Sequence, residues 1–300
     1  MNLKSLWILV LACVATTLSA QKKPLDQSAY DGWKSIVSPK VSENGDWICY
    51  AITPQRGDAL LEFYNAGTKQ TTRIERGGSP AWFNNDTWAT FKIAVPFAKV
   101  RQAKIDKVKA DKMPKDTFAV MNLAEMKVVK LPGAKELKTS AKGALYAYTY
   151  EVTPVKDTTV KDSAAKGNKT PGKYDRLVVV DVRTGDSTVV DSVKNFTVAE
   201  NGRSVLYTRE ADSLKAVYVY TVDPKRGVLQ RELWSSKLGA VSPSLVLDRS
   251  GEQGAFLVTA DTVKHALYDL YYFSTTDLKP RQVADAQIIG LPGGYAVSRF

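Results

Sequence analysis

The sequence predicts an all-β protein of the β-propeller type, on three observations. A polar turn followed by an aromatic or β-branched strand occurs five times, at intervals of about 51 residues, a spacing typical of propeller blades. Long amphipathic helical patterns are nearly absent after Gln21. The composition is 44% hydrophobic, 10% aromatic and 24% charged, which excludes intrinsic disorder, collagen and coiled coil.

Residues 1–20 have the layout of a secretory signal peptide. One early lysine precedes an apolar run over residues 6–14, and small and polar residues follow as far as Ala20. We expect cleavage after Ala20 and export of the mature chain to the periplasm or the medium. A lipoprotein with its lipid on Cys13 is the alternative, but the residues before Cys13 make a poor cleavage box. No later stretch reaches the apolar length of a membrane-spanning helix.

The copies of the repeat share one layout. Each begins with Asn, Asp, Ser or Gly residues, which suit a tight hairpin turn, and continues into a strand of aromatic or β-branched residues. The copies are Ser42–Tyr50, Phe83–Phe91, Ser140–Tyr148, Ala199–Tyr207 and Asp248–Phe256.

Further strands complete each unit. A second strand follows each copy and ends in a polar turn, at Leu60–Tyr64, Phe118–Met121, Leu177–Val182, Val217–Val222 and Leu270–Phe273. A third strand follows that turn, as at Gln70–Ile74, Lys127–Leu131 and Ser187–Val190. One sheet of three or four strands cannot bury both of its faces alone, so we expect the sheets to stack radially. The prediction is five blades and the start of a sixth, in an incomplete ring spanning residues 21–300.

The aromatic residues of these strands are interpreted as the core between blades. They are Trp47, Trp82, Trp88, Tyr146, Tyr148, Tyr207, Tyr218 and Tyr220. Cys49 is interpreted as a small buried hydrophobe, because a thiol needs a base or cation beside it to act as a nucleophile. A pair of β-sandwiches is the alternative architecture, but it does not explain the recurrence of a whole three-strand unit.

Two insertions interrupt the repeat. In the first, at about 96–116, Phe97, Val100 and Val108 share one helical face, which predicts a short helix or ordered arm. This charged segment is either a solvated loop or a contact to another domain or subunit. The second insertion, Val155–Lys173, is rich in Lys, Thr, Asp, Gly and Pro and is predicted to be a mobile surface loop.

The chain carries little catalytic equipment. It has no Gly-x-Ser-x-Gly motif, and Ser79-Pro80 in the nearest match is interpreted as a turn that opens a blade. His265 is the only histidine, so a His-rich metal site is excluded, and we interpret His265 as a structural or surface residue. Walker, dinucleotide-binding, zinc and calcium motifs are absent. We therefore nominate no catalytic, cofactor-binding or metal-binding residue and expect no cofactor.

The net charge is +11, from 42 Lys and Arg against 31 Asp and Glu. Binding to nucleic acid is not expected, because the chain is predicted to be exported and has no RNA-binding aromatic motif or zinc-finger spacing. The charge is interpreted as a solubility or surface-adhesion property of an exported protein.

The sequence ends within another copy of the repeat. Gly293–Phe300 has the turn and the start of an aromatic strand, without partner strands. Soluble proteins avoid the exposed sheet face and strand edges that an open propeller would have. We therefore expect this chain to be the N-terminal portion, a fragment, of a longer protein.

Two segments of the chain resemble a known family. Lys23–Ile36, followed by Ser42–Tyr50, is similar to the start of exported bacterial serine peptidases of the prolyl oligopeptidase family. Pro96–Lys104 and Asp111–Asp116 resemble an insertion of the same subgroup. The resemblance covers essentially the whole mature chain but only the propeller half of the family's architecture.

The resemblance implies a propeller packed on a C-terminal α/β-hydrolase domain, which this chain lacks. The propeller would admit peptide substrates and exclude folded proteins, while a Ser-Asp-His triad in the missing domain would carry out acyl transfer. No triad residue can be assigned here, so the chain alone is expected to be inert. Dipeptidyl peptidases of the family hold the substrate's amino terminus with two adjacent acidic residues on the propeller, and no such pair occurs in this sequence. A non-catalytic periplasmic propeller used for binding or scaffolding is the alternative.

Overall fold

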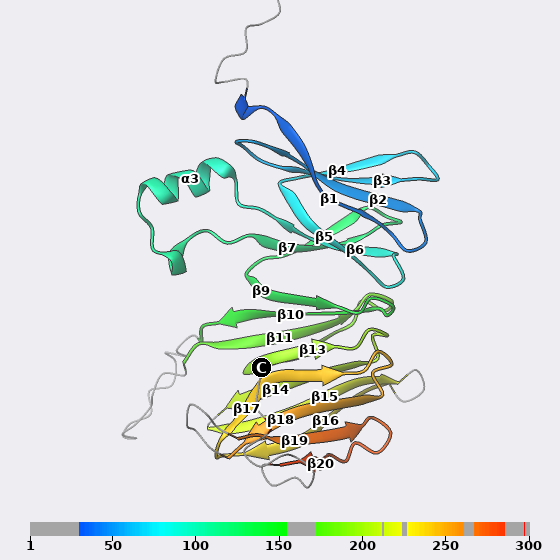
Figure 1. Ribbon diagram of the computed structural model, residues 1–300, viewed down its shortest axis with the longest axis vertical. Helices are drawn as coiled ribbons and strands as arrows, with labels where there is room; N and C mark the ends of the chain where they lie inside the picture. The colour runs from blue at the N-terminus through cyan, green and yellow to red at the C-terminus, as the bar shows by residue number, and fades with distance from the viewer. Residues whose placement is uncertain are drawn as a thin grey trace, which may run out of the picture.

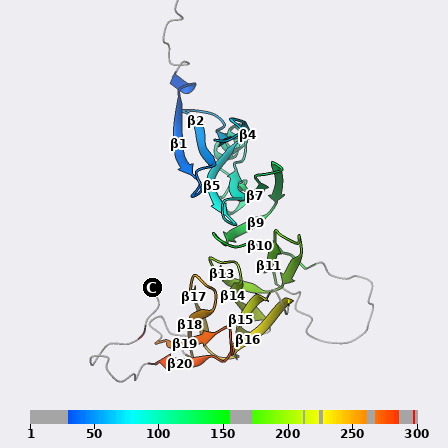
Figure 2. The same cartoon turned by 90° about the vertical axis from the view of Figure 1, so that its right-hand side faces the viewer.

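The computed structural model describes residues 30–154, 172–211, 213–223, 227–260, 267–285 and 297. These residues form five four-stranded sheets that follow one another along the chain. Each strand pairs antiparallel with its neighbours in sequence, so every sheet is a meander. Figure 1 shows the sheets stacked one above another from the N-terminal end to the C-terminal end, and the perpendicular view in Figure 2 keeps the same order. The predicted all-β class and the five predicted blades are confirmed.

The first two sheets hold the N-terminal strands. The first sheet contains β1 (Lys34–Val41), β2 (Trp47–Pro54), β3 (Leu60–Asn65) and β4 (Thr71–Glu75). The second contains β5 (Gly77–Phe83), β6 (Trp88–Ile93), β7 (Thr117–Asn122) and β8 (Lys127–Leu131). Between β6 and β7 lie helix α3 (Phe97–Ile105) and the short 3-10 helix η1 (Ala110–Lys112).

The other three sheets repeat this plan. The third sheet contains β9 (Ala134–Thr139), β10 (Leu145–Val152), β11 (Tyr174–Asp181) and β12 (Ser187–Val190). The fourth contains β13 (Val193–Val198), β14 (Ser204–Ala211), β15 (Leu214–Asp223) and β16 (Gly227–Ser236). The fifth contains β17 (Ala240–Leu247), β18 (Gln253–Thr259), β19 (Asp269–Ser274) and β20 (Arg281–Ala284).

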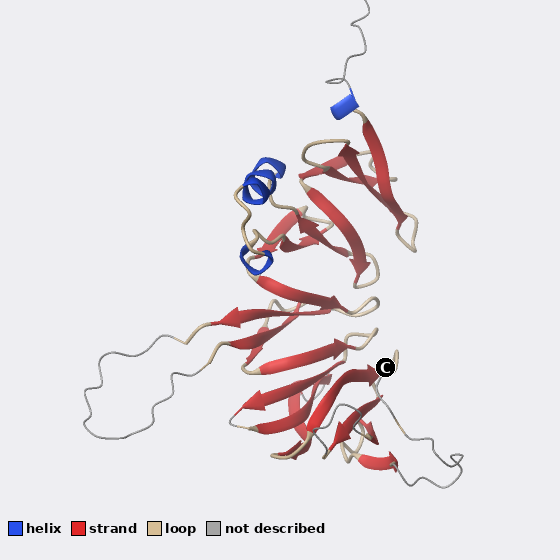
Figure 3. Ribbon diagram, turned by 60° about the vertical axis from the view of Figure 1, so that its left-hand side comes forward, coloured by secondary structure: helices blue, strands red, loops and turns tan. Residues whose placement is uncertain are grey.

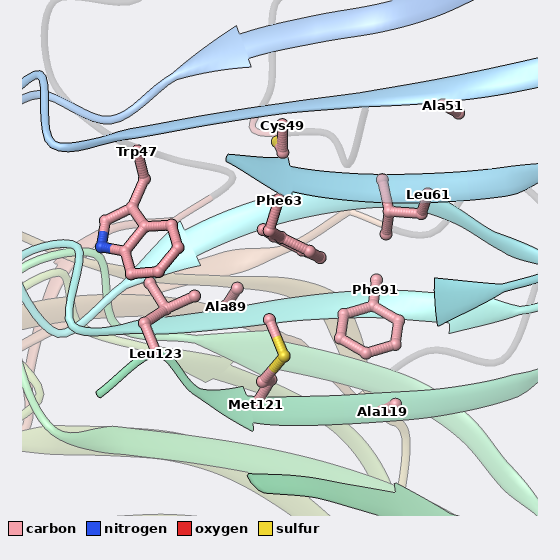
Figure 4. Close-up of a cluster of buried hydrophobic side chains, with 10 residues drawn as sticks. All are labelled: Trp47, Cys49, Ala51, Leu61, Phe63, Ala89, Phe91, Ala119, Met121 and Leu123. Carbon is pink, nitrogen blue, oxygen red and sulfur yellow. The ribbon is translucent and has the colours of Figure 1, made fainter. Parts of the chain in front are cut away.

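A separate apolar cluster lies between each pair of neighbouring sheets. Between the first and second sheets, Phe63 packs on Phe91 with ring centroids 5.8 Å apart, and Trp47 and Met121 join them (Figure 4). Alternate residues of β2 point into this cluster, as expected for a strand with one buried face. All eight aromatic residues predicted for the core lie in these clusters or pack against them. Because fully burying one Phe stabilises a fold by roughly 1.5–3 kcal/mol, the clusters hold the sheets together.

The sequence pattern did not reveal the first strand of each sheet. These strands, β1, β5, β9, β13 and β17, each show a register shift against the second strand. A shift of this kind breaks the alternation of apolar and polar residues by which strands are recognised. The turn predicted at Ser79-Pro80 is wrong for the same reason: both residues lie within β5, at its register shift, where Ser79 has a φ of 52°. Pro80 has no N–H to donate, which suits an unpaired position.

The two ends of each sheet differ. At one end, here called the turn side, tight hairpins join the first strand to the second and the third to the fourth. At the other end, the connection side, the second strand leads to the third. Figure 3 shows α3 on the opposite side of the molecule from the hairpin turns, and in Figure 1 the arrow of β10 points toward the side of α3. Both insertions follow the second strand of a sheet, so both begin on the connection side.

The helix predicted in the first insertion is confirmed, with one correction. α3 ends at Ile105, so Val108 lies beyond it and does not share its face with Phe97. No helix in the described part of the chain is long and apolar enough to cross a bilayer. The predicted signal peptide, residues 155–171 of the second insertion, His265 and all of Gly293–Phe300 except Val297 lie outside the described residues.

Candidate interaction face

Hydrogen bonds between sheets occupy the turn side. The five repeat turns, Ser42–Asp46, Asn84–Thr87, Ser140–Ala144, Ala199–Arg203 and Asp248–Glu252, lie in one row, here called the turn column. Backbone amides of one turn donate to carbonyls of the next, at Asn84 to Ser140 (3.2 Å), Asn85 to Ala141 (3.1 Å), Lys142 to Glu200 (2.8 Å) and Asn201 to Arg249 (3.1 Å).

Side chains and glycines extend this contact. Asp86 accepts from the backbone amides of Glu43 and Asn44, at 2.6 and 3.3 Å, and so ties the first turn to the second. Gly143 lets the third and fourth turns approach, because a Cβ there would lie 2.0 Å from the carbonyl oxygen of Asn201. The repeated polar turns are therefore structural: their backbone groups join the blades.

Open polar cavities lie on both sides of the sheets, with volumes of about 500 and 410 Å³ for two on the turn side. On the connection side, a cavity of about 470 Å³ lies between the second and third sheets, and its lining includes Lys115 and Asp116 from the end of the first insertion. Lys135, Tyr150 and Glu151 line the same cavity from the third sheet. The cavity therefore presents both charges and a phenol, a surface suited to a polar or charged partner.

An ion-pair network fixes one wall of this cavity. Glu151 and Asp175 lie directly opposite each other on β10 and β11, an unfavourable pairing of like charges by itself. Lys135 lies between them, 2.6 Å from Asp175 and 3.2 Å from Glu151, and Lys173 binds Glu151 at 2.7 Å. The hydrogen bond to Asp175 raises the pKa of Lys135, and the hydrogen bond from Lys173 lowers the pKa of Glu151. Lys135 and Glu151 therefore both stay charged near neutral pH.

A second network lies close by on the same side. Arg176 forms a two-pronged pair with Asp191, with Nη2 3.1 Å from Oδ2, and also reaches the Tyr150 hydroxyl at 3.5 Å. Its hydrogen bonds hold the pKa of Asp191 below the ordinary value. Arg209 donates to the backbone oxygen of Asp191 at 3.0 Å and lines a further cavity of about 270 Å³ near the fourth and fifth sheets.

The charges of Lys135, Glu151 and Arg176 are each held by an opposite partner, which suits a fixed binding surface. Among the described residues, no three His, Cys, Asp or Glu side chains gather as a metal site. Cys49 is fully buried, and burial raises the pKa of its thiol to about 11, which confirms the predicted small hydrophobe.

Sequence reasoning missed Lys135, Glu151, Arg176 and Asp191. Each of these residues is separated along the chain from its ion-pair partner by 15 to 40 residues, so no local motif reveals the pairs. The one usable signal is the register: once β10 and β11 are paired, Glu151 opposite Asp175 calls for a cation between them.

No protein family and no curated protein matches the chain in sequence. Solved structures do have a similar arrangement of strands. The acylaminoacyl peptidase of Pyrococcus horikoshii is 10% identical over 87% of this chain and 41% of its own, with a TM-score of 0.42. The chain therefore spans about two fifths of that protein's length.

Two further neighbours are also peptidases. The β-propeller domain of the Trilobed protease from Pyrococcus furiosus is 12% identical over 84% of this chain and 72% of its own, with a TM-score of 0.42. A prolyl endopeptidase is 12% identical over 85% of this chain and 35% of its own, with a TM-score of 0.44. The structural neighbours of this chain thus include the propellers of peptidases.

Proposed function

We propose that this chain is the substrate-gating propeller of an exported serine peptidase of the prolyl oligopeptidase family that hydrolyses peptides. The resemblance of Lys23–Ile36 and of the first repeat to that family supports the assignment. So does the fold, which is the half of the architecture that the resemblance implies. The segment over residues 1–20 supports export to the periplasm.

The observation that carries the proposal is the position of the first insertion on the connection side. The turn side has the hydrogen bonds from sheet to sheet and two cavities of its own. On the connection side a charged cavity is lined in part by the first insertion, and we infer that the catalytic domain rests there. In this arrangement the residues of this chain bind peptide substrates and exclude folded proteins. The groups that react with the substrate belong to the other domain.

The first test is the reading frame downstream of Phe300. We expect it to encode further blades and then a Gly-x-Ser-x-Gly segment followed by Asp and His. The full polypeptide should then react with a fluorophosphonate probe, and the present chain alone should not. A continuation without a nucleophile motif would contradict the proposal and leave the non-catalytic binding module.

The second test addresses gating. The full polypeptide should cleave short peptides, with kcat/KM falling as the peptide lengthens, and should leave a folded protein intact under the same conditions. Equal cleavage of short peptides and folded proteins would contradict a gating role without contradicting the peptidase assignment. The mature chain isolated from the producing cell should begin at Gln21, as N-terminal sequencing would check.

A further inference from the structure

The segment between Val95 and Asp116, here called the basic arm, projects from the second sheet (Figure 1). It contains α3 and η1. Besides two acidic residues, Asp106 and Asp111, its charged side chains are all cations, namely Lys99, Arg101, Lys104, Lys107, Lys109, Lys112 and Lys115.

The basic arm is fastened to the sheet at its base. The Val95 amide donates to Asp116 Oδ1 at 3.1 Å, which closes the two ends of the arm on each other. The Phe97 amide donates to Asp58 Oδ1 at 2.7 Å and joins the start of α3 to the first sheet. Ala103 is buried. The arm therefore presents its side chains in a fixed arrangement.

The charge of the basic arm is not neutralised by the rest of the described chain. Elsewhere some cations have acidic partners, as Lys135, Arg176 and Arg183 do, and others, such as Lys69 and Lys127, form no ion pair with a described residue. None of the arm's cations forms an ion pair with a residue that the structure describes. Of the two acidic residues, Asp106 accepts from the Gln102 side chain at 2.9 Å. The density of unpaired cations on the arm therefore favours a partner that carries negative charge.

Apolar side chains lie among these cations. Phe97, Arg101 and Ile105 follow one face of α3 at the i, i+4 and i+8 positions. Phe97 is 37% exposed, Ile105 59% and Val108, just beyond the helix, 36%. The arm thus offers both positive charge and exposed apolar surface to its partner.

We propose that the basic arm binds the surface of an anionic lipid bilayer. The arm has one Arg and otherwise only Lys as its cations, whereas protein interfaces are enriched in Arg and depleted of Lys. A lysine close to an anionic membrane surface is attracted to it, so a cluster of lysines favours adsorption to anionic lipid. Lysine stems can extend along the headgroups while Phe97 and Ile105 enter the interface. The arm would hold the chain at a membrane surface.

Vesicle sedimentation tests this assignment. The full chain, with the same N-terminus in every variant, is mixed at low salt with vesicles of phosphatidylcholine alone or with 30% phosphatidylglycerol. We expect the anionic vesicles to bind it more tightly. The triple variant Lys104→Gln, Lys107→Gln, Lys109→Gln should lower the partition coefficient on the order of a hundredfold. Ile105→Ser should lower it several-fold without changing the charge.

The matched control is Lys69→Gln, Lys127→Gln, Lys130→Gln, which removes the same charge from exposed lysines outside the arm. We expect this control to lower the partition coefficient on anionic vesicles much less than the triple variant of the arm does. The proposal would be overturned if the two triple variants lowered the partition coefficient equally. It would also be overturned if the unmodified chain bound equally to vesicles with and without phosphatidylglycerol. Binding to duplex DNA as tight as binding to anionic vesicles, with the same dependence on the arm, would also overturn it, because the arm would then bind any polyanion. Circular dichroism checks that each variant keeps its fold.

Discussion

Cys49 lies in the cluster between the first and second sheets, with no solvent exposure. Its thiol pKa is raised to about 11 by burial, which lowers the thiolate fraction at pH 8 about a hundredfold relative to the ordinary value. In a Cys13→Ser chain we expect Cys49 to react with a thiol reagent at least a hundredfold more slowly in the folded state than in urea. Rapid reaction of the folded chain would show that the cluster opens.

Gly143 lies where the third and fourth repeat turns touch. A Cβ at this position would collide with backbone atoms of Asn201, which cannot rotate away. We expect Gly143→Ala to lower the free energy of unfolding by roughly 1–3 kcal/mol, measured by urea denaturation. Gly78→Ala is the control, because a Cβ there meets nothing within 4 Å. Similar effects from the two substitutions would mean that the turn contact is dispensable.

Glu62 makes the stability of the folded chain depend on pH. Its side chain is 8% exposed and accepts hydrogen bonds from Tyr50 at 2.7 Å and Arg73 at 2.8 Å. The Tyr50 hydrogen bond is the main reason that the pKa of Glu62 is lowered. The folded state therefore binds the proton less readily than the unfolded state, so this contribution to stability is complete above the unfolded pKa, at about 4.3, and is lost as the pH falls through the folded pKa.

The substitution Glu62→Gln removes that titration. We expect the free energy of unfolding of the unmodified chain to fall more steeply than that of the Glu62→Gln variant as the pH is lowered from 6 toward 3. Parallel curves for the two chains would contradict the assigned role of Glu62.

At the scale of elements, the basic arm is an insertion in the hairpin of β6 and β7, and the two strands pair with each other without contributions from the arm. β6 and β7 stay paired as far as Ile93 and Thr117, close to the two ends of the arm. The cost of closing a loop also changes slowly with its length. We expect replacement of residues 96–115 by a short Gly-Asn linker to shift Tm by only a few degrees. Phe91→Ala, which removes a buried ring from the neighbouring core, should shift it more.

The second and third strands were predictable because they contain runs of apolar, buried residues, as β3, β7 and β14 do. Lys127–Leu131 and Ser187–Val190 were predicted with the bounds that β8 and β12 have. The first strands were not, since a register shift interrupts each of them and β1 is exposed along its whole length. The local pattern thus identifies strands with apolar, buried residues and misses strands whose pairing register is interrupted.

For the molecule as a whole, the two end sheets have apolar faces turned outward. Ile36 and Val41 of β1 are 66% and 61% exposed, and Val246 on β17 is 58% exposed. We expect this chain to self-associate reversibly in sedimentation velocity experiments, and Ile36→Lys with Val41→Lys to suppress the association.

The control for that experiment is Val129→Lys with Val189→Lys, at exposed positions of the second and third sheets. Suppression by both pairs would mean that added charge, rather than the face of the first sheet, decides the outcome.

The candidate interaction face was less predictable than the fold. The basic arm was visible in the sequence as a charge run. The ion pairs around Lys135 and Arg176 depend on which strands lie side by side, and no spacing along the chain encodes that. The repeated turns were correctly read as hairpins, but their role in joining sheets became visible only in three dimensions.

The pairing of strands solely with their sequence neighbours has a consequence for synthesis. Each sheet has all its partners as soon as its fourth strand leaves the ribosome, so no strand waits for one made later. A completed sheet also offers an apolar face to the one that follows. Folding can therefore keep pace with translation, sheet by sheet, from the N-terminal end.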